Sequence, residues 1–254
     1  SQVGFQRLSC LNSRDIHVNR FGMRDVERSL EAHGPRIALL GDSMLQGLSV
    51  ADNQTVSQQL EGFLGRRSEV LNFGVSSVGT SVELLIYRKH VRPFRPDSVF
   101  LLLYLGNDID DNHPELKGRF DPIMAQISPY LISNESGALQ LQPGMARSTS
   151  ILRRMVPLTE VSLFFFDALQ NWRRTKMQIA MTSLQKTPLL ETFREEAWSI
   201  TEKVLVQFKR EVEADGGRFG LVLLPDGITD IGRTGSVTEL TERSVARIQA
   251  IGQE

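Results

Sequence analysis

The chain has 254 residues, of which 41% are hydrophobic, and a formal net charge of −1 at pH 7. This length supports one α/β domain with a sizeable core. The basic residues are scattered along the chain, so the electrostatic footprint of a nucleic-acid-binding protein is missing. The single cysteine, Cys10, excludes an internal disulfide framework and a cysteine-rich zinc site.

The sequence contains no membrane-spanning segment. No apolar run approaches the roughly 18 residues that such a helix needs, and the first residues have neither a basic start nor an apolar signal core. We therefore expect a soluble chain. The first residue is Ser1 instead of Met, so an upstream signal or anchor is compatible with the sequence, and an extracytoplasmic location stays open. The oligomeric state stays open as well.

The first half of the chain predicts a parallel sheet. Residues 1–35 are polar and end at a Gly-Pro break, which predicts an N-terminal extension packed on a main domain of residues 36–254. Three apolar runs then begin at Arg36, Glu69 and Ser98, and each stops at a glycine. Helical patterns at residues 55–64 and 81–90 lie between them. Two successive βαβ units with right-handed crossovers follow from this order.

Residues 110–190 predict a long insertion. A hairpin is expected over residues 129–141, around an Asn-Glu-Ser-Gly turn, and helices over residues 150–156 and 161–177. Long connections that follow the carboxyl end of a strand often form lids or binding loops. We expect this insertion to act as a lid that controls the size of the substrate.

The last part of the chain returns to the α/β pattern. An amphipathic helix is predicted over residues 192–214, with Trp198, Leu205, Phe208 and Val212 at helical spacing. A strand at residues 218–225, a loop at 226–235 and a helix at 237–251 follow. The sequence stops where a doubly wound sheet is expected to add a strand, so we expect the domain to be incomplete at its C-terminus.

A serine hydroxyl and two candidate hydrogen-bond donors stand at the ends of the three apolar runs. Ser43 comes directly after the first run, Gly74 ends the second, and Asn107 follows the third. The carboxyl ends of parallel strands meet at one edge of a sheet, where open α/β folds bind their ligands. A serine hydroxyl with nearby hydrogen-bond donors is suited to attack on a carbonyl group. For the tripeptide at residues 41–43 alone, a simple capped strand-to-helix turn is the competing interpretation.

The three segments resemble the first three sequence blocks of the SGNH, or GDSL, hydrolase superfamily. The matching tripeptides are Gly41-Asp42-Ser43, Asn72-Phe73-Gly74 and Gly106-Asn107-Asp108, and the segment at residues 19–25 resembles a lead-in found in some bacterial members. The resemblance implies a three-layer α/β/α sandwich with a mainly parallel, flavodoxin-like sheet and a serine esterase that needs no cofactor or metal.

The resemblance also implies roles for particular residues. Ser43 would be the nucleophile that forms an acyl-enzyme, and Ser43, Gly74 and Asn107 would form the oxyanion hole. Asp42 and Asp108 would support these groups. The substrate would be a small-molecule or glycan acyl ester, and transfer of the acyl group to a sugar hydroxyl is a close variant of hydrolysis.

The fourth block of the superfamily, Asp-x-x-His near the C-terminus, is missing from this sequence. Its histidine is the general base and its aspartate orients that base. The four histidines are His17, His33, His90 and His113, and none follows an aspartate by three residues near the end. His113 is the candidate substitute base, although a single loop histidine is more often a solvated surface group.

Two other functions compete with an esterase. A catalytically inactive binding module would keep the pocket and lack the base, and a flavodoxin-like cofactor binder would share the sheet but has no phosphate loop. The acidic residues Asp108, Asp110 and Asp111 with His113 could be metal ligands, but a solvated acidic loop is the simpler interpretation.

Overall fold

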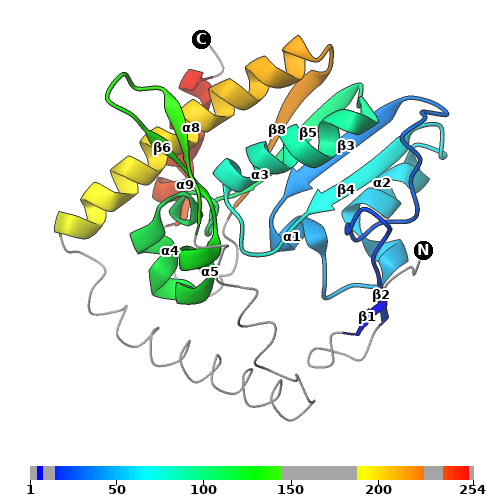
Figure 1. Cartoon of the computed structure of the whole chain (residues 1–254), viewed down its shortest axis with the longest axis horizontal. Helices are drawn as coiled ribbons and strands as arrows, with labels where there is room; N and C mark the ends of the chain where they lie inside the picture. The colour runs from blue at the N-terminus through cyan, green and yellow to red at the C-terminus, as the bar shows by residue number, and fades with distance from the viewer. Residues whose placement is uncertain (1–4, 8–14, 145–187, 226–236, 252–254) are drawn as a thin grey trace.

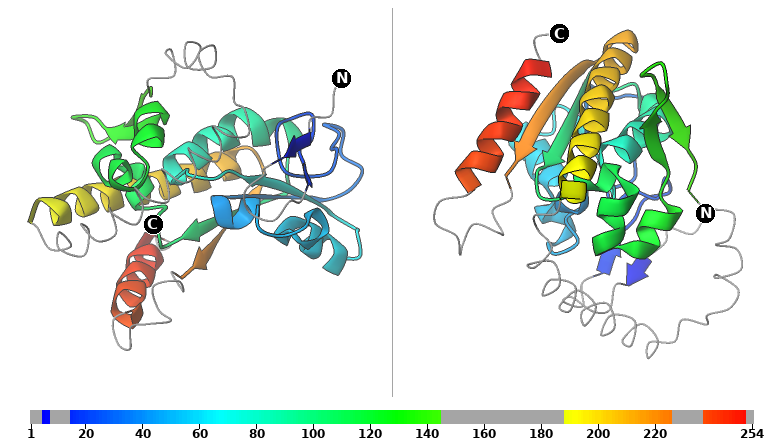
Figure 2. Two further views of the ribbon diagram at one scale, coloured as in Figure 1. Left: turned by 90° about the horizontal axis from the view of Figure 1, so that it is seen from below. Right: turned by 90° about the vertical axis from the view of Figure 1, so that its left-hand side faces the viewer.

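The structure, a computed structural model, describes residues 5–7, 15–144, 188–225 and 237–251. At its centre is a four-stranded parallel sheet with the order β4-β3-β5-β8. The strands are β3 (Arg36–Gly41), β4 (Glu69–Gly74), β5 (Ser98–Tyr104) and β8 (Arg218–Leu224). Helices lie on both faces of this sheet (Figure 1, Figure 2). The predicted α/β class with a parallel, flavodoxin-like sheet is therefore confirmed.

The strands are apolar because both faces of the sheet are covered. Alternate residues of β3 point to opposite faces, so Leu40 joins one core cluster and Leu39 joins the other. The register places Gly41 opposite Gly74 on one side and Leu102 on the other. The carboxyl ends of the three strands predicted from the sequence therefore lie at the same edge.

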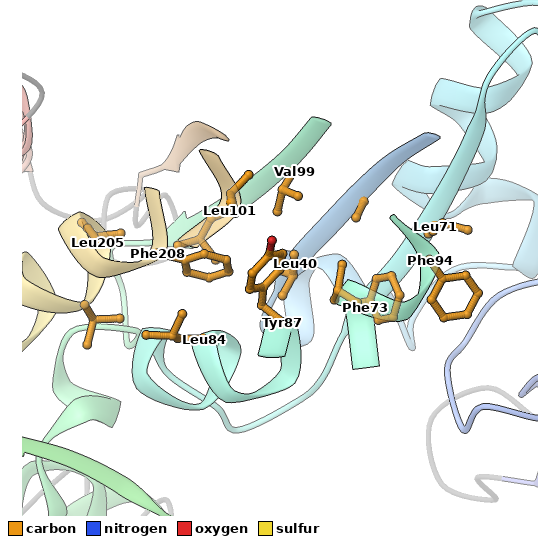
Figure 3. Close-up of a cluster of buried hydrophobic side chains, with 14 of the residues drawn as sticks. Leu40, Leu71, Phe73, Leu84, Tyr87, Phe94, Val99, Leu101, Leu205 and Phe208 are labelled. Atoms are coloured by element: carbon orange, nitrogen blue, oxygen red, sulfur yellow. The ribbon is translucent and has the colours of Figure 1, made fainter. Parts of the chain in front are cut away.

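The larger core lies between the sheet and a layer formed by two helical segments. The first is α3 (Thr80–Ile86), which continues as the π-helix η2 (Tyr87–Val91) and the 3-10 helix η3 (Arg92–Phe94), and the second is α8 (Pro188–Ala214). Figure 3 shows Tyr87 and Phe208 from these segments packed below Leu40 and Leu101 of the sheet. The predicted helices at 81–90 and 192–214 are confirmed, and α8 begins four residues earlier than expected.

The opposite face is covered by α1 (Ser43–Gln46) and α2 (Val56–Phe63). A 3-10 helix, η1 (Asp52–Gln54), precedes α2, and the Thr55 hydroxyl caps α2 by accepting from the amide of Gln58. The predicted helix is confirmed, but two of the apolar side chains that give it helical spacing do not pack against the sheet. Val56 is 47% exposed and Phe63 is 89% exposed, whereas Glu61 is buried.

The buried glutamate on α2 has a specific partner set. Glu61 Oε2 accepts from Arg28 Nη2 at 2.8 Å and from the amide of Val70 at 2.9 Å. These bonds hold α2 against the N-terminal segment and β4. The ion pair between Glu61 and Arg28 thus helps to determine which face of α2 packs. The spacing of hydrophobic residues does not predict such a pair.

The insertion begins with the 3-10 helix η4 (Asp110–Asn112), α4 (Pro114–Phe120) and α5 (Pro122–Ile127). The hairpin of β6 (Tyr130–Ser133) and β7 (Leu139–Gln142) follows, which confirms the predicted hairpin. Asn134 Oδ1 stabilises its turn by accepting from the amides of Ser136 and Ala138. The helices predicted at 150–156 and 161–177 lie outside the described residues.

The last element, α9 (Val237–Ile251), has the predicted bounds. It lies near β8 and α8 (Figure 2), and Arg247 forms ion pairs with Glu195 and Glu202 of α8. Within the described part of the chain, no helix combines the length and the apolar character needed to cross a membrane.

The N-terminal segment contains a short antiparallel pair, β1 (Phe5–Arg7) and β2 (Asp15–His17). Beyond it, residues 19–35 lie against the main sheet. Arg36, which is fully buried, donates to the backbone carbonyls of Ser29, Leu30 and Glu31. The boundary of the extension at residue 35 and the incomplete C-terminus remain predictions.

Candidate active site

Ser43 is the first residue of α1 and is exposed at the carboxyl edge of the sheet. The preceding residue, Asp42, is 1% exposed and caps the helix, since its Oδ1 accepts from the amide of Met44 at 2.8 Å. The Ser43 hydroxyl donates to Asp42 Oδ2 at 3.3 Å. The strand-to-helix turn therefore both caps α1 and presents the serine to solvent.

Gly74 is needed for the close approach of β4 to α1. A Cβ at this position would lie 2.4 Å from the backbone nitrogen of Gln46 and 2.8 Å from the carbonyl carbon of Leu45. The Gly74 amide donates to Asn72 Oδ1 at 2.9 Å. The sequence predicts this amide as an oxyanion donor, but in the structure it already has an acceptor within its own strand.

Asn107 follows β5 and lies at the same edge. Its Nδ2 donates to Asp111 Oδ2 at 2.9 Å. An amide group carries two N–H bonds, so one N–H of Asn107 remains besides the one bound to Asp111. The parallel register of β3 and β5 places Ser43 and Asn107 after strand ends at the same edge of the sheet.

Carboxyl groups from three successive loops or helices are buried beneath this edge. Asp42, Glu83 and Asp108 are 1%, 0% and 0% exposed, respectively. Among the described residues, neither oxygen of Glu83 and only one oxygen of Asp108 has a hydrogen-bond partner. The prediction of a solvated acidic loop at residues 108–111 is thus wrong, because the loop folds inward against the β4–α3 connection.

Burial changes the acidity of these groups. Desolvation first, and then the neighbouring Asp42 and Asp111, raise the pKa of Glu83 well above its usual value. Desolvation, Glu83 and Asp42 likewise raise the pKa of Asp108 well above its usual value. The pKa of Asp42 is raised by burial, while hydrogen bonds from Met44 and Ser43 lower it. Like charges in a low-dielectric space favour the protonated forms.

His113, the candidate substitute base, is held by α8 instead of facing solvent. It is 8% exposed, its ring stacks on Phe193 with centroids 4.8 Å apart, and its Nε2 lies 3.0 Å from Glu196 Oε2. The prediction of a solvated side chain is wrong, because α8 covers the loop. Among the described contacts, the hydroxyl of Ser43 meets Asp42 and no histidine.

The other three histidines do not approach Ser43 in the described contacts. His90 is exposed on η2 and His33 is exposed in the N-terminal segment. The backbone amide of His17 donates to Asp52 Oδ2 at 3.2 Å. The described part of the chain contains no group of three or more His, Cys, Asp or Glu side chains that could hold a metal ion.

The lead-in at residues 19–25 supports the site, a role that the sequence did not reveal. Arg24 has a side chain that is 3% exposed. It donates to the backbone carbonyls of Gln46, Gly47 and Val50 and to the carboxylate of Asp52. It thereby fixes the loop that follows α1, the helix that begins at Ser43. The motif at residues 19–25 is the sequence signal for this role. Residue spacing alone, however, does not show that Arg24 contacts the loop after α1.

Asp25 connects the same segment to β4. It pairs with Arg28, with Arg28 Nε 2.9 Å from Asp25 Oδ2, and it accepts from the amide of Asn72 at 3.3 Å. Burial raises the pKa of Asp25, while the hydrogen bond and the charge of Arg28 lower it. The lead-in thus contacts the second sequence block through Asn72 and the loop that follows α1 through Arg24.

No family model and no curated protein sequence matches the chain. Solved structures that resemble it include TesA, with 14% identity and a TM-score of 0.40 over 86% of this chain and 73% of that chain. AlinE4, a SGNH-hydrolase family esterase, has 13% identity and a TM-score of 0.31 over 88% of this chain and 97% of its own. A catalytic mutant of Axe2, an acetylxylan esterase from Geobacillus stearothermophilus, has 11% identity and a TM-score of 0.31 over 75% of this chain and 77% of its own.

One of these structures, AlinE4, is an esterase of the SGNH-hydrolase family, which the three sequence blocks resemble. The identities are at most 14% and the TM-scores at most 0.40, and similarity this low does not indicate which residues form the site. The function is therefore inferred from the residues at the carboxyl edge of the sheet.

Proposed function

We propose that this chain is a serine-dependent hydrolase of acyl esters of the SGNH superfamily, with Ser43 as the nucleophile. The observation that supports it is the exposed Ser43 hydroxyl at the start of α1, with the Asn107 amide on the neighbouring loop. Nucleophilic attack on an ester needs both a hydroxyl group and donors for the oxyanion that forms.

In the proposed reaction, Ser43 Oγ attacks the ester carbonyl carbon and loses its proton to a base. The carbonyl oxygen becomes an oxyanion, which accepts from the Ser43 amide and from the Asn107 N–H that is not bound to Asp111. The base returns this proton to the departing oxygen, so collapse expels the alcohol and leaves an acyl-enzyme, which water hydrolyses to the free acid and Ser43. Gly74 provides the close packing of β4 on α1 instead of a free donor.

Apolar groups beside the serine suit the acyl part of the substrate. Met44 is 47% exposed, and Val75, whose amide donates to the Gly41 carbonyl at 3.0 Å, is 38% exposed. Both lie next to sequence blocks of the site. The acceptor of the acyl group is either water or a sugar hydroxyl, so an O-deacetylase or O-acyltransferase acting on a carbohydrate is the finer form of the proposal.

A catalytically inactive binding module is the second candidate. It is favoured by one observation, since the described contacts of Ser43 include no histidine and His113 is engaged by Glu196. In this alternative, the pocket binds an acyl ester or glycan without cleaving it.

Labelling with a fluorophosphonate separates the two candidates. The hydrolase should become covalently labelled at Ser43, as read by peptide mapping, and should hydrolyse p-nitrophenyl acetate. Ser43→Ala should lose both signals, whereas Ser49→Ala, which changes an exposed serine nearby, should keep them. A folded chain that is neither labelled nor active would refute the hydrolase and favour the binding module.

A further inference from the structure

Lys117 is a buried lysine that the proposed reaction does not use. It lies on α4, and its side chain is 1% exposed. Its Nζ donates to the backbone carbonyl of Ser77 at 2.6 Å and lies 4.0 Å from Asp111 Oδ1. Lysine is rarely buried unless its charge has partners. Here the partners lie on the two loops that follow β4 and β5.

The first partner belongs to the loop that follows β4 and contacts α1. Ser77 has a φ of 59°, which is uncommon for a residue other than glycine and is retained only where the surroundings hold it. The preceding residue, Ser76, donates its amide to Gln46 Oε1 on α1 at 3.0 Å. Lys117 therefore binds the backbone carbonyl of Ser77, in a strained loop that also contacts α1 through Ser76.

The second partner orients the proposed oxyanion donor. Asp111 accepts one N–H of Asn107 through Oδ2, while its Oδ1 faces Lys117. Burial, the largest influence, raises the pKa of Asp111, and the charge of Lys117 lowers it. Lys117 therefore favours the ionised carboxylate, which is the stronger acceptor for the Asn107 amide. With one N–H held by Asp111, the Asn107 amide keeps one further N–H that can serve the proposed oxyanion.

We propose that Lys117 is a positioning residue of the Ser43 site, which joins the loops after β4 and β5 and, through Asp111, sets the orientation of the Asn107 amide. This inference rests on the proposed serine hydrolase function. Packing alone gives no reason for an ammonium group here, because an apolar side chain of similar length would fill the space without the loss of hydration.

The direct test compares Lys117→Met with wild type and with Lys89→Met, which removes an exposed lysine. All variants are assayed at a temperature at which their melting curves show the folded state. With p-nitrophenyl acetate, we expect Lys117→Met to lower kcat by about 10- to 100-fold, below the loss for deleting a whole oxyanion donor, and to leave KM within about twofold. Lys89→Met should leave both constants unchanged.

A pair of double variants removes the concern that an unpaired Asp111 carboxylate prevents folding. Lys117→Met/Asp111→Asn keeps an oxygen that accepts from Asn107, whereas Lys117→Met/Asp111→Leu keeps the volume and loses the acceptor. We expect the Asn form to recover much of kcat and the Leu form to remain low. Equal kcat values in the two folded double variants would overturn the inference.

A spectroscopic measurement tests positioning without using activity. The side-chain amide of Asn107 gives a pair of ¹H–¹⁵N signals, identified by their loss in Asn107→Ala. We expect these signals to shift in Lys117→Met and to stay in place in Lys89→Met. Unchanged signals in Lys117→Met would overturn the inference whether or not the chain hydrolyses esters. An active wild type that is silenced by Ser43→Ala, together with an unchanged kcat in Lys117→Met, would overturn the inference and leave the proposed function intact.

Discussion

Replacement of Gly74 by alanine tests how closely the sheet edge packs against the nucleophile helix. The added methyl group would lie 2.4 Å from the Gln46 nitrogen, 2.8 Å from the Leu45 carbonyl carbon and 2.9 Å from the Gln46 Cα. All three contacts are backbone atoms, so no side chain can rotate away. Either α1 or β4 must move. Overpacking of this kind costs about 1–3 kcal/mol, and rigid backbone partners place Gly74→Ala at the upper end.

The assay is urea denaturation together with the rate of fluorophosphonate labelling at Ser43. We expect Gly74→Ala to lose about 2–3 kcal/mol of unfolding free energy, or roughly 2–4 °C in melting temperature for each kcal/mol. Labelling should also slow, because α1 carries Ser43 at its first position.

Gly62→Ala is the matched control for this prediction. Gly62 lies within α2, and a Cβ there would meet nothing within 4 Å. Alanine is favoured over glycine inside a helix by about 0.5–1 kcal/mol, so this variant should be more stable than wild type. If Gly74→Ala matched wild type in both stability and labelling, the close packing of β4 on α1 would be refuted as a requirement of the site.

Three further predictions concern two buried charged groups near the edge and one exposed ring on α2. Burial raises the pKa of Glu83 well above the usual 4.5, so the folded state keeps a proton that the unfolded state releases, and this group should lower wild-type stability by at most ~1.4 kcal/mol per pH unit as the pH rises above about 4.5. Glu83→Gln should make the decline shallower in denaturation from pH 5 to pH 8, and the buried Asp108 should account for what remains, whereas the same change at the exposed Glu213 should leave the decline unchanged. Arg24→Met should lose about 2–4 kcal/mol in urea denaturation and slow the labelling of the serine, because three backbone carbonyls lose a charged donor; a stable variant with full labelling would contradict its role at α1. Phe63→Ser should change stability by less than about 0.5 kcal/mol, since the ring is 89% exposed, and a larger loss in the same assay would show that the ring is packed.

The elements of the sheet could be predicted from the sequence because their signals are local. Each strand is a short apolar run that stops at a glycine, and α9 has a helical period that gave its bounds of 237–251. The hairpin at residues 130–142 follows from its turn residues in the same way. The packed face of α2 could not be predicted, because Glu61 is buried by Arg28, a partner 33 residues away.

The site could be predicted in part for the same reason. Parallel strands place their carboxyl ends together, so the meeting of Ser43 and Asn107 at one edge follows from the order of the elements. The hydrogen bond between the Gly74 amide and Asn72 Oδ1 does not follow, because it depends on a side-chain rotamer. The burial of His113 depends on α8, which begins 75 residues later in the chain.

The parallel order of the sheet also explains why acidic groups gather beneath the nucleophile. Asp42 caps the helix after β3, Glu83 lies in the first turn of α3 after β4, and Asp108 accepts from the amide of Tyr104 at the end of β5. Each carboxyl group is locally favourable, because it lies near the positive end of a helix or at a turn. The sheet, however, brings all three into one buried space, where two ionised groups repel each other. Protonation of Glu83 and Asp108 relieves this repulsion, and Lys117 lies at the side of the same space next to Asp111. A change in any one of these acidic or basic groups should therefore alter the protonation of the others, so their effects on stability should be coupled in double-mutant cycles instead of additive.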